Sequence, residues 1–96
     1  MIKHIVLFKL KDKSPENLAK TKEVLLSMDG NVPLLRSIEV GLDFLHSGRS
    51  FDVALITTLD SREALDAYQV DPYHVSVVKK HMHAVREDSV AIDFEI

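Results

Sequence analysis

The segment Ile2-Lys-His-Ile-Val-Leu-Phe-Lys-Leu10 decides the fold of this 96-residue chain. In an extended strand, one face would carry His4 together with four apolar side chains, those of Ile2, Val6, Phe8 and Leu10. Ile5 and Leu7 would occupy the opposite face. A strand that is apolar on both faces is typical of the centre of a sheet rather than its edge.

A second strand that is apolar on both faces is predicted from Phe51 to Leu59. By contrast, the segment from Ser37 to Phe44 and the segment that begins at Ser89 alternate between apolar and polar residues. Alternation of this kind predicts strands with one buried face and one solvent-exposed face. We therefore expect two central strands and two edge strands.

The first helix is predicted from Pro15 to about Ser27, with Ser14 as its N-cap. Gly30 should terminate it. The segment Asp60-Ser-Arg-Glu63 resembles a capping box, in which Asp60 would be the N-cap. It predicts a second helix from Ser61 to Val70.

The segment Ala67-Tyr-Gln-Val-Asp-Pro-Tyr-His74 should interrupt the helix that begins at Ser61. Pro72 disfavours the helical conformation for Asp71 and suits the first position of a new helix, which should run to about Arg86. Tyr68 would then lie before the break and His74 in the first turn after it. A corner of this kind can direct both polar tips into one space, which His4 could also reach.

The predicted order of elements is βαββαβ, with the second helix split. Central first and third strands fit the antiparallel order 4-1-3-2 of the ferredoxin-like α+β fold. The two helical layers can cover only one face of such a sheet. The apolar band on the other face predicts a C2 homodimer in which two sheets pack together, forming a dimeric α/β barrel. We expect one domain over residues 1–96.

Composition excludes several classes of partner. A net charge of −3 leaves no basic field for nucleic acid or an anionic membrane surface. The chain has no cysteine, which excludes disulfides and thiolate chemistry. No apolar run approaches the roughly 20 residues of a membrane span, and the N-terminus shows no signal-peptide pattern. We expect a cytoplasmic protein.

Three residues are candidates for catalysis. His74 could act as a general base, because an ordinary imidazole has a pKa near ~6.5 and is partly neutral at physiological pH. Tyr68 could donate a hydrogen bond to a developing enolate oxygen. The alternative is that Tyr68 is a core aromatic residue and His74 a structural one. His4 is either a donor in a ligand pocket or a buried histidine that needs one hydrogen-bond partner.

The histidines do not predict a metal site. His81 and His83 are two residues apart on a helix and point in different directions. His74 and His81 would be separated by ~10 Å along a helix, too far to share one ion. One stripe of this helix is expected to face the core, with Val77, Val78, His81 and Val85.

The chain resembles the stress-responsive dimeric α+β barrel family, abbreviated Dabb. The resemblance rests on Lys3-His-Ile-Val-Leu-Phe-Lys-Leu-Lys11, on Phe51-Asp-Val-Ala-Leu-Ile56 and on Tyr68-Gln-Val-Asp-Pro-Tyr-His-Val75. It implies a ferredoxin-like fold and a dimer that forms a barrel from two sheets. In the second of these segments, the position of a further pocket histidine in one plant branch falls near Val53. In the third, Asp71 replaces the first histidine of an HPxH-like motif.

That plant branch consists of polyketide cyclases, which close a ring by an intramolecular aldol reaction without metal or organic cofactor. The resemblance implies Tyr68 and His74 as catalytic residues, with His4 as an accessory histidine.

We therefore expect a homodimer that binds a small, partly apolar molecule, with cofactor-independent acid–base chemistry of the cyclase, lyase or isomerase type. Four further residues are candidate ligand contacts: Val6, Phe8, Val53 and Tyr73. The alternatives are a non-catalytic dimer with a stress-protective or structural role and, third, a haem- or oxygen-using monooxygenase of the same architecture. No cofactor is expected in the first two cases.

Overall fold

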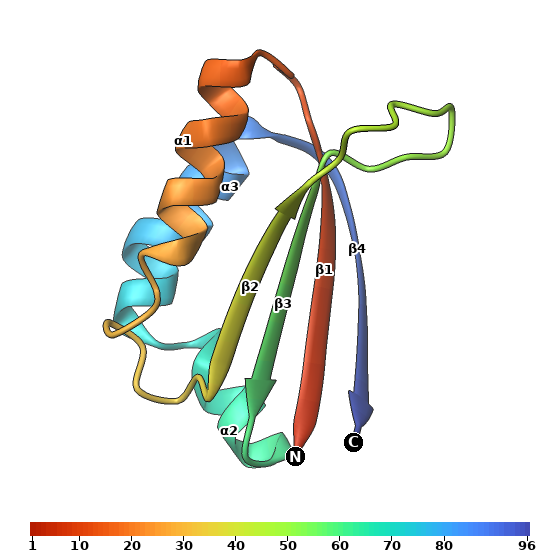
Figure 1. Cartoon of the computed structure of the whole chain (residues 1–96). Helices are drawn as coiled ribbons and strands as arrows, with labels where there is room; N and C mark the ends of the chain where they lie inside the picture. Colours follow the sequence, from red (N-terminus) through yellow and green to blue (C-terminus); the bar gives the residue numbers. More distant parts are fainter.

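Four antiparallel strands form one sheet, and every helix lies on the same side of it in the computed structural model, which describes all 96 residues (Figure 1). The strands are β1 (Ile2–Leu10), β2 (Ser37–Leu42), β3 (Val53–Leu59) and β4 (Arg86–Glu95). The helices are α1 (Pro15–Leu26), α2 (Arg62–Gln69) and a final helix that consists of the π-helical η1 (His74–Lys79) and α3 (Lys80–Val85).

The sheet order is β2-β3-β1-β4, which is the predicted order 4-1-3-2 counted from the other edge. The ferredoxin-like βαββαβ fold is therefore confirmed. The two strands with apolar residues on both faces, β1 and β3, take the centre, as their burial requires. The register places Ile5 of β1 opposite Ile56 of β3 and Ile92 of β4, so these three side chains share one face of the sheet.

Serine side chains cap both α1 and α2. The Ser14 hydroxyl accepts a hydrogen bond from the Asn17 backbone N–H at 3.2 Å, as predicted for the first helix. The predicted cap of the second helix was wrong, because the Ser61 hydroxyl, and not the Asp60 carboxylate, caps α2. Asp60 directly follows β3 and instead accepts a hydrogen bond from Arg36 Nε at 2.8 Å.

The break at Pro72 is confirmed. Helix α2 ends at Gln69, and the chain becomes helical again at Pro72. The sequence did not predict the π-helical turns that begin at His74, in which backbone hydrogen bonds join residues i and i+5. A π-helix changes which residues share a face, so Val78 is buried while Val77 is exposed, although both were expected in the core stripe.

Three strand limits differ from the predicted ones. Strand β2 ends at Leu42, and Phe44 lies in the following loop with 88% of its surface exposed. The chain bends at Phe44 and Leu45, where the Asp43 carboxylate accepts the backbone N–H of His46. Strand β3 begins at Val53 rather than Phe51. Strand β4 begins at Arg86 rather than Ser89, because Arg86 already pairs with Leu10 of β1. The loop between β2 and β3 projects away from the sheet (Figure 1).

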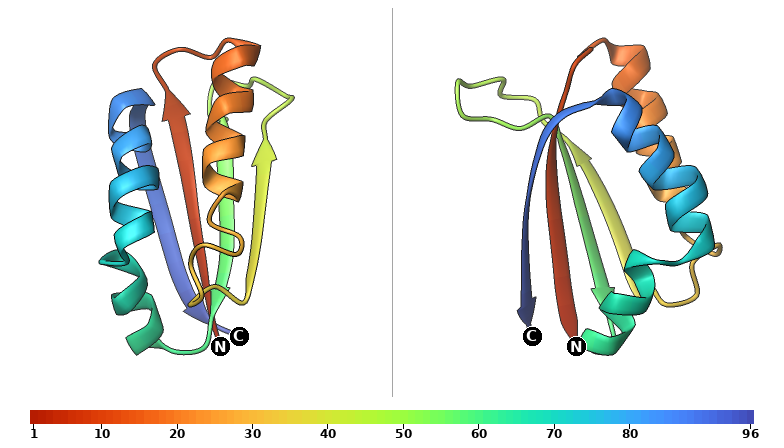
Figure 2. Two further views of the ribbon diagram at one scale, coloured as in Figure 1. Left: turned by 90° about the vertical axis from the view of Figure 1, so that its left-hand side faces the viewer. Right: turned by 180° about the vertical axis from the view of Figure 1, so that it is seen from behind.

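The helices leave one face of the sheet uncovered (Figure 2). On β4, Val90, Ile92 and Phe94 alternate with residues that face the helices, and their exposed fractions are 47%, 58% and 40%. They continue the apolar band of Ile5 and Leu7 on β1, which is the face predicted to pack against a second copy. None of the helices has the length and apolar character that a membrane span requires.

Candidate functional site

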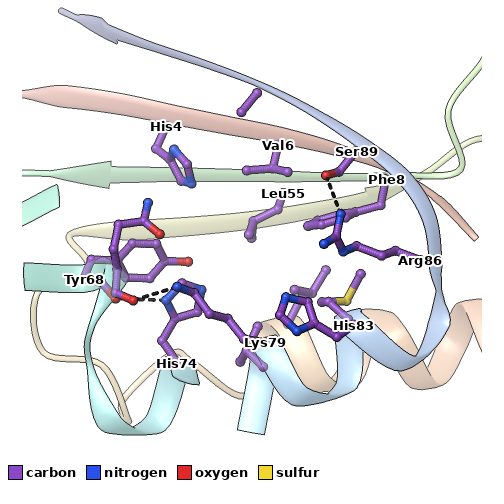
Figure 3. A pocket seen from close by; sticks show the side chains of 15 residues that line it. His4, Val6, Phe8, Leu55, Tyr68, His74, Lys79, His83, Arg86 and Ser89 are labelled. Atoms are coloured by element: carbon purple, nitrogen blue, oxygen red, sulfur yellow. Dashed lines mark hydrogen bonds between the residues drawn. The ribbon is translucent and has the colours of Figure 1, made fainter. Parts of the chain in front are cut away.

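A cavity of about 360 Å³ lies between the helix-covered face of the sheet and the final helix (Figure 3). Strand β1 contributes His4, Val6 and Phe8, α2 contributes Tyr68, and η1 contributes His74. This volume falls in the range of about 300–1,000 Å³ that is usual for small-molecule sites. The helix break at Pro72 brings Tyr68 and His74 to the cavity from two separate helical segments.

His74 is fixed by hydrogen bonds at its backbone and at one ring nitrogen. Its backbone N–H donates to the Asp71 carboxylate at 3.0 Å, and its Nδ1–H donates to the Tyr68 carbonyl oxygen at 2.9 Å. Because a carbonyl can only accept, this contact places the proton of the neutral ring on Nδ1 and leaves the lone pair on Nε2. Nε2 makes no hydrogen bond within the chain, and no buried side-chain nitrogen or oxygen lacks a partner, so Nε2 borders accessible space.

Burial lowers the pKa of His74, and the positive charge of Lys79 acts in the same direction. The Tyr68 carbonyl and Asp71 oppose this shift without reversing it. His74 is therefore neutral at pH 7, with Nε2 available to accept a proton.

Tyr68 is fully buried, and its ring stacks on the imidazole of His74 with 4.0 Å between the ring centroids. Burial raises the pKa of Tyr68, and the nearby charge of Asp71 adds to the effect, so the phenol stays protonated at neutral pH. Its hydroxyl donates to Met28 Sδ at 3.6 Å, and a thioether sulfur is a weak acceptor. Tyr68 thus lines the cavity, and its hydroxyl hydrogen is engaged only by Met28.

His4 is buried, and its Nδ1 is hydrogen-bonded to Asp93 Oδ1 on the neighbouring strand β4. The β1–β4 register places these two residues directly opposite each other. The edge of the His4 ring meets the ring of Tyr68, with 5.8 Å between centroids and 68° between planes. The expectation that a buried His4 needs a partner is confirmed, and a local pattern could not have identified Asp93, which is 89 positions away.

The structure brings five of the seven predicted site residues to one cavity: His4, Val6, Phe8, Tyr68 and His74. It does not bring Val53 or Tyr73 there. Val53 is packed into the hydrophobic core, and the Tyr73 hydroxyl donates to Ser27 Oγ at 2.6 Å, on the side of α1. Val53 shares a face of β3 with Leu55, which does line the cavity, but lies two residues away along the strand. The start of the final helix directs Tyr73 toward Ser27 instead.

Sequence reasoning missed five further polar residues that line the cavity: Gln69, Lys79, His83, Arg86 and Ser89. Lys79 and His83 are four residues apart, a spacing that puts two helical residues on one face, and this was the available signal. No group of three or more His, Cys, Asp or Glu side chains is placed to hold a metal ion.

These features define a small ferredoxin-like α+β domain with a ligand-sized cavity between its sheet and its helices. The family model that describes the stress responsive A/B barrel domain, Dabb, matches residues 2–96. The chain belongs to the Dabb family.

Two curated relatives are stress-response A/B barrel domain-containing proteins of Arabidopsis thaliana. One is 30% identical over 98% of this chain and 36% of its own length. The other is 29% identical over 98% of this chain and 46% of its own length. This chain thus spans less than half the length of either relative.

Solved structures show the same fold. A dimeric protein of unknown function with a ferredoxin-like fold, from Bacteroides fragilis, is 29% identical, with a TM-score of 0.80 over 99% of this chain and 95% of its own. The hydroxynitrile lyase of Passiflora edulis is 18% identical, with a TM-score of 0.80 over 99% of this chain and 92% of its own. At 18% identity, this second likeness shows the fold alone.

Proposed function

We propose that the cavity binds a small, partly apolar carbonyl compound and that His74 acts on it as a general base, in a homodimer. One observation carries this proposal: His74 borders the cavity with a lone pair on Nε2 while its other nitrogen is held by the Tyr68 carbonyl. A lowered pKa keeps that lone pair free of a proton at neutral pH. His4, fixed by Asp93, adds a second imidazole to the cavity wall.

The chemistry would begin when Nε2 of His74 takes a proton from the carbon next to the carbonyl group. The C–H electron pair then moves onto the carbonyl oxygen and forms an enolate. The imidazolium is stabilised by its Nδ1–H bond to the Tyr68 carbonyl. Where a carbon–carbon double bond is conjugated with the enolate, return of the proton to its far carbon gives isomerisation. Attack of the enolate carbon on a second carbonyl of the same molecule, followed by return of the proton to the new alkoxide, gives aldol cyclisation.

Tyr68 would position His74 through ring stacking and its carbonyl, and its protonated hydroxyl would donate to the enolate oxygen. This donation requires the O–H bond to turn away from Met28. The cost is small because sulfur is a weak acceptor.

The test is incorporation of solvent deuterium next to the carbonyl group, followed by NMR, across a panel of methyl ketones and β-dicarbonyl compounds. Wild-type protein should accelerate exchange for at least one compound, and His74→Gln should abolish the acceleration. His46→Gln is the matched control, because His46 lies in the exposed loop between β2 and β3. Equal acceleration by the His74→Gln protein would remove the imidazole from the reaction.

A second candidate function is binding without catalysis. It is favoured by the Tyr68 hydroxyl, whose hydrogen is already donated to Met28 Sδ. A compound that binds at the cavity, shifts the NMR signals of His74 and shows no accelerated exchange would support this second function over the first.

A further inference from the structure

The first and last residues of η1, His74 and Lys79, both line the cavity. Backbone hydrogen bonds in a π-helix join residues five apart, so Lys79 lies about one π-helical turn after His74. In an α-helix, with 3.6 residues per turn, two residues five apart would point about 140° away from each other. The π-helical turns therefore place an ammonium group on the wall of the cavity that also carries the imidazole (Figure 3).

Two consecutive carbonyl groups at the end of α2 anchor these side chains. His74 Nδ1–H donates to the Tyr68 carbonyl oxygen at 2.9 Å, and Lys79 Nζ donates to the Gln69 carbonyl oxygen at 2.8 Å. Carbonyl groups in the last turn of a helix lack partners within the helix and favour positive charge. Burial lowers the pKa of His74, and the charge of Lys79 lowers it further, as a cation near the imidazole must.

The ammonium group of Lys79 is not neutralised by an acid. No ion pair of the structure includes it, and no Asp or Glu lines the cavity. The Asp71 carboxylate, at the helix break, accepts the backbone N–H of His74 instead. The side chain of Lys79 is half-buried, and two of its three N–H groups have no partner in the chain. A half-buried charge of this kind stabilises an anion more strongly than a fully solvated one does.

We propose that Lys79 is a second catalytic residue, whose ammonium group donates a hydrogen bond to the enolate oxygen that forms when His74 takes the proton. This inference rests on the proposed function and adds the group that stabilises its charged intermediate. Nε2 of His74 receives the proton, the C–H electron pair moves onto the carbonyl oxygen, and Lys79 keeps its own proton throughout. Lys79 has N–H groups free for this role, whereas the Tyr68 hydroxyl must first turn away from Met28. An enolate oxygen can accept from both groups.

The first test needs no turnover and uses 4-nitrophenol, whose phenolate oxygen carries negative charge as an enolate oxygen does and whose ionised form absorbs visible light. At a pH equal to the pKa of the free probe, binding to wild-type protein should raise the ionised fraction, because a charged donor favours the anion. Lys79→Gln should abolish this increase and weaken phenolate binding about tenfold. Lys79→Arg keeps the charge and should retain the increase.

The second test is the exchange of solvent deuterium. For a compound whose exchange wild-type protein accelerates, Lys79→Gln should lower kcat about 100-fold and change KM little, since the enolate charge develops only toward the transition state. Lys79→Arg should restore most of the rate. A lysine that only caps α2 would, when replaced, lower the melting temperature and leave the phenolate fraction and kcat of the folded protein unchanged.

The matched control is Lys80→Gln. It removes the neighbouring lysine, which is exposed and does not line the cavity. Both the phenolate fraction and the exchange rate should stay at the wild-type values.

The outcomes separate this inference from the proposed function. Equal phenolate fractions on wild type and Lys79→Gln would refute the role of Lys79, even where His74→Gln abolishes exchange and so upholds the general base. A probe that shifts no amide NMR signal of the cavity residues would refute it as well, because an ammonium group with free donors should bind a phenolate. If no compound exchanges, the proposed function falls together with the catalytic role of Lys79, and a phenolate signal that depends on Lys79 would then assign an anion-binding site instead.

Discussion

The imidazole of His74 stacks on the phenol ring of Tyr68 at 14° between their planes, and the same imidazole donates to the backbone carbonyl of Tyr68. One residue therefore holds the other by both its side chain and its backbone, across the helix break at Pro72. The double contact fixes the tautomer and the ring plane of His74 without help from any distant part of the chain.

The pKa of His74 should lie below the ordinary value of 6.5, because burial disfavours its charged form. A ¹H–¹³C NMR titration should show the His74 signal moving below pH 6.5. A His74 titration at or above 6.5 would contradict the geometry described above.

The same shift links His74 to stability. Between the lowered pKa and 6.5, the unfolded chain binds more protons than the folded one, so the free energy of unfolding rises with pH. The contribution of His74 to the free energy of unfolding is complete above about pH 6.5 and is lost as the pH falls toward the lowered pKa of the folded state. His74→Gln should flatten this slope in urea unfolding experiments. The pKa of His81 is also lowered by burial, so the difference between the two proteins isolates His74.

Removal of the Tyr73 hydroxyl should lower the free energy of unfolding more than removal of the Tyr68 hydroxyl. Tyr73→Phe should lower the free energy of unfolding by about 1 kcal/mol, because the Tyr73 hydroxyl donates to Ser27 Oγ at 2.6 Å. Tyr68→Phe should cost less, because its hydroxyl has only the sulfur of Met28 as acceptor. Chemical denaturation of the two variants side by side measures the difference. A larger loss for Tyr68→Phe would mean that its hydroxyl has a stronger partner than Met28.

Asp93→Ala should lower the free energy of unfolding by about 1 kcal/mol, because it leaves His4 buried without a hydrogen-bond partner. The matched control is Glu87→Ala, on the same strand, where the side chain is exposed and makes no hydrogen bond or ion pair. Urea unfolding followed by circular dichroism compares the two. Equal effects would show that the Asp93 bond contributes nothing specific.

The homodimer prediction is tested on the open face of the sheet. Ile92→Asp places a charge on this apolar face, where Ile92 is 58% exposed in a single copy, and it should convert a dimer into monomers of 10.8 kDa. Light scattering coupled to size-exclusion chromatography gives the mass. Val75→Asp is the control, because Val75 is an exposed apolar residue in the helix layer. A wild-type mass of one chain at micromolar concentration would refute the dimer.

Much of the fold follows from local sequence patterns. The apolar residues on both faces of 2–10 and 51–59 predicted the two central strands, and Pro72 predicted the break between α2 and the final helix. These predictions succeed because side-chain periodicity and the fixed φ of proline act within a few residues. The errors at Asp60 and Ser89 have the opposite cause: pairing with Arg36 and with strand β1 decides those limits.

The sequence by itself determined that Tyr68 and His74 flank a helix break and that His4 lies on an apolar strand face. Only the tertiary structure decided that Asp93 is the partner of His4 and that Lys79 and Arg86 share their cavity. The register of β4 against β1 sets the first pair, and the π-helical turns set where the final helix directs its side chains. Neither is encoded in a local pattern, because each depends on how elements far apart in the sequence pack together.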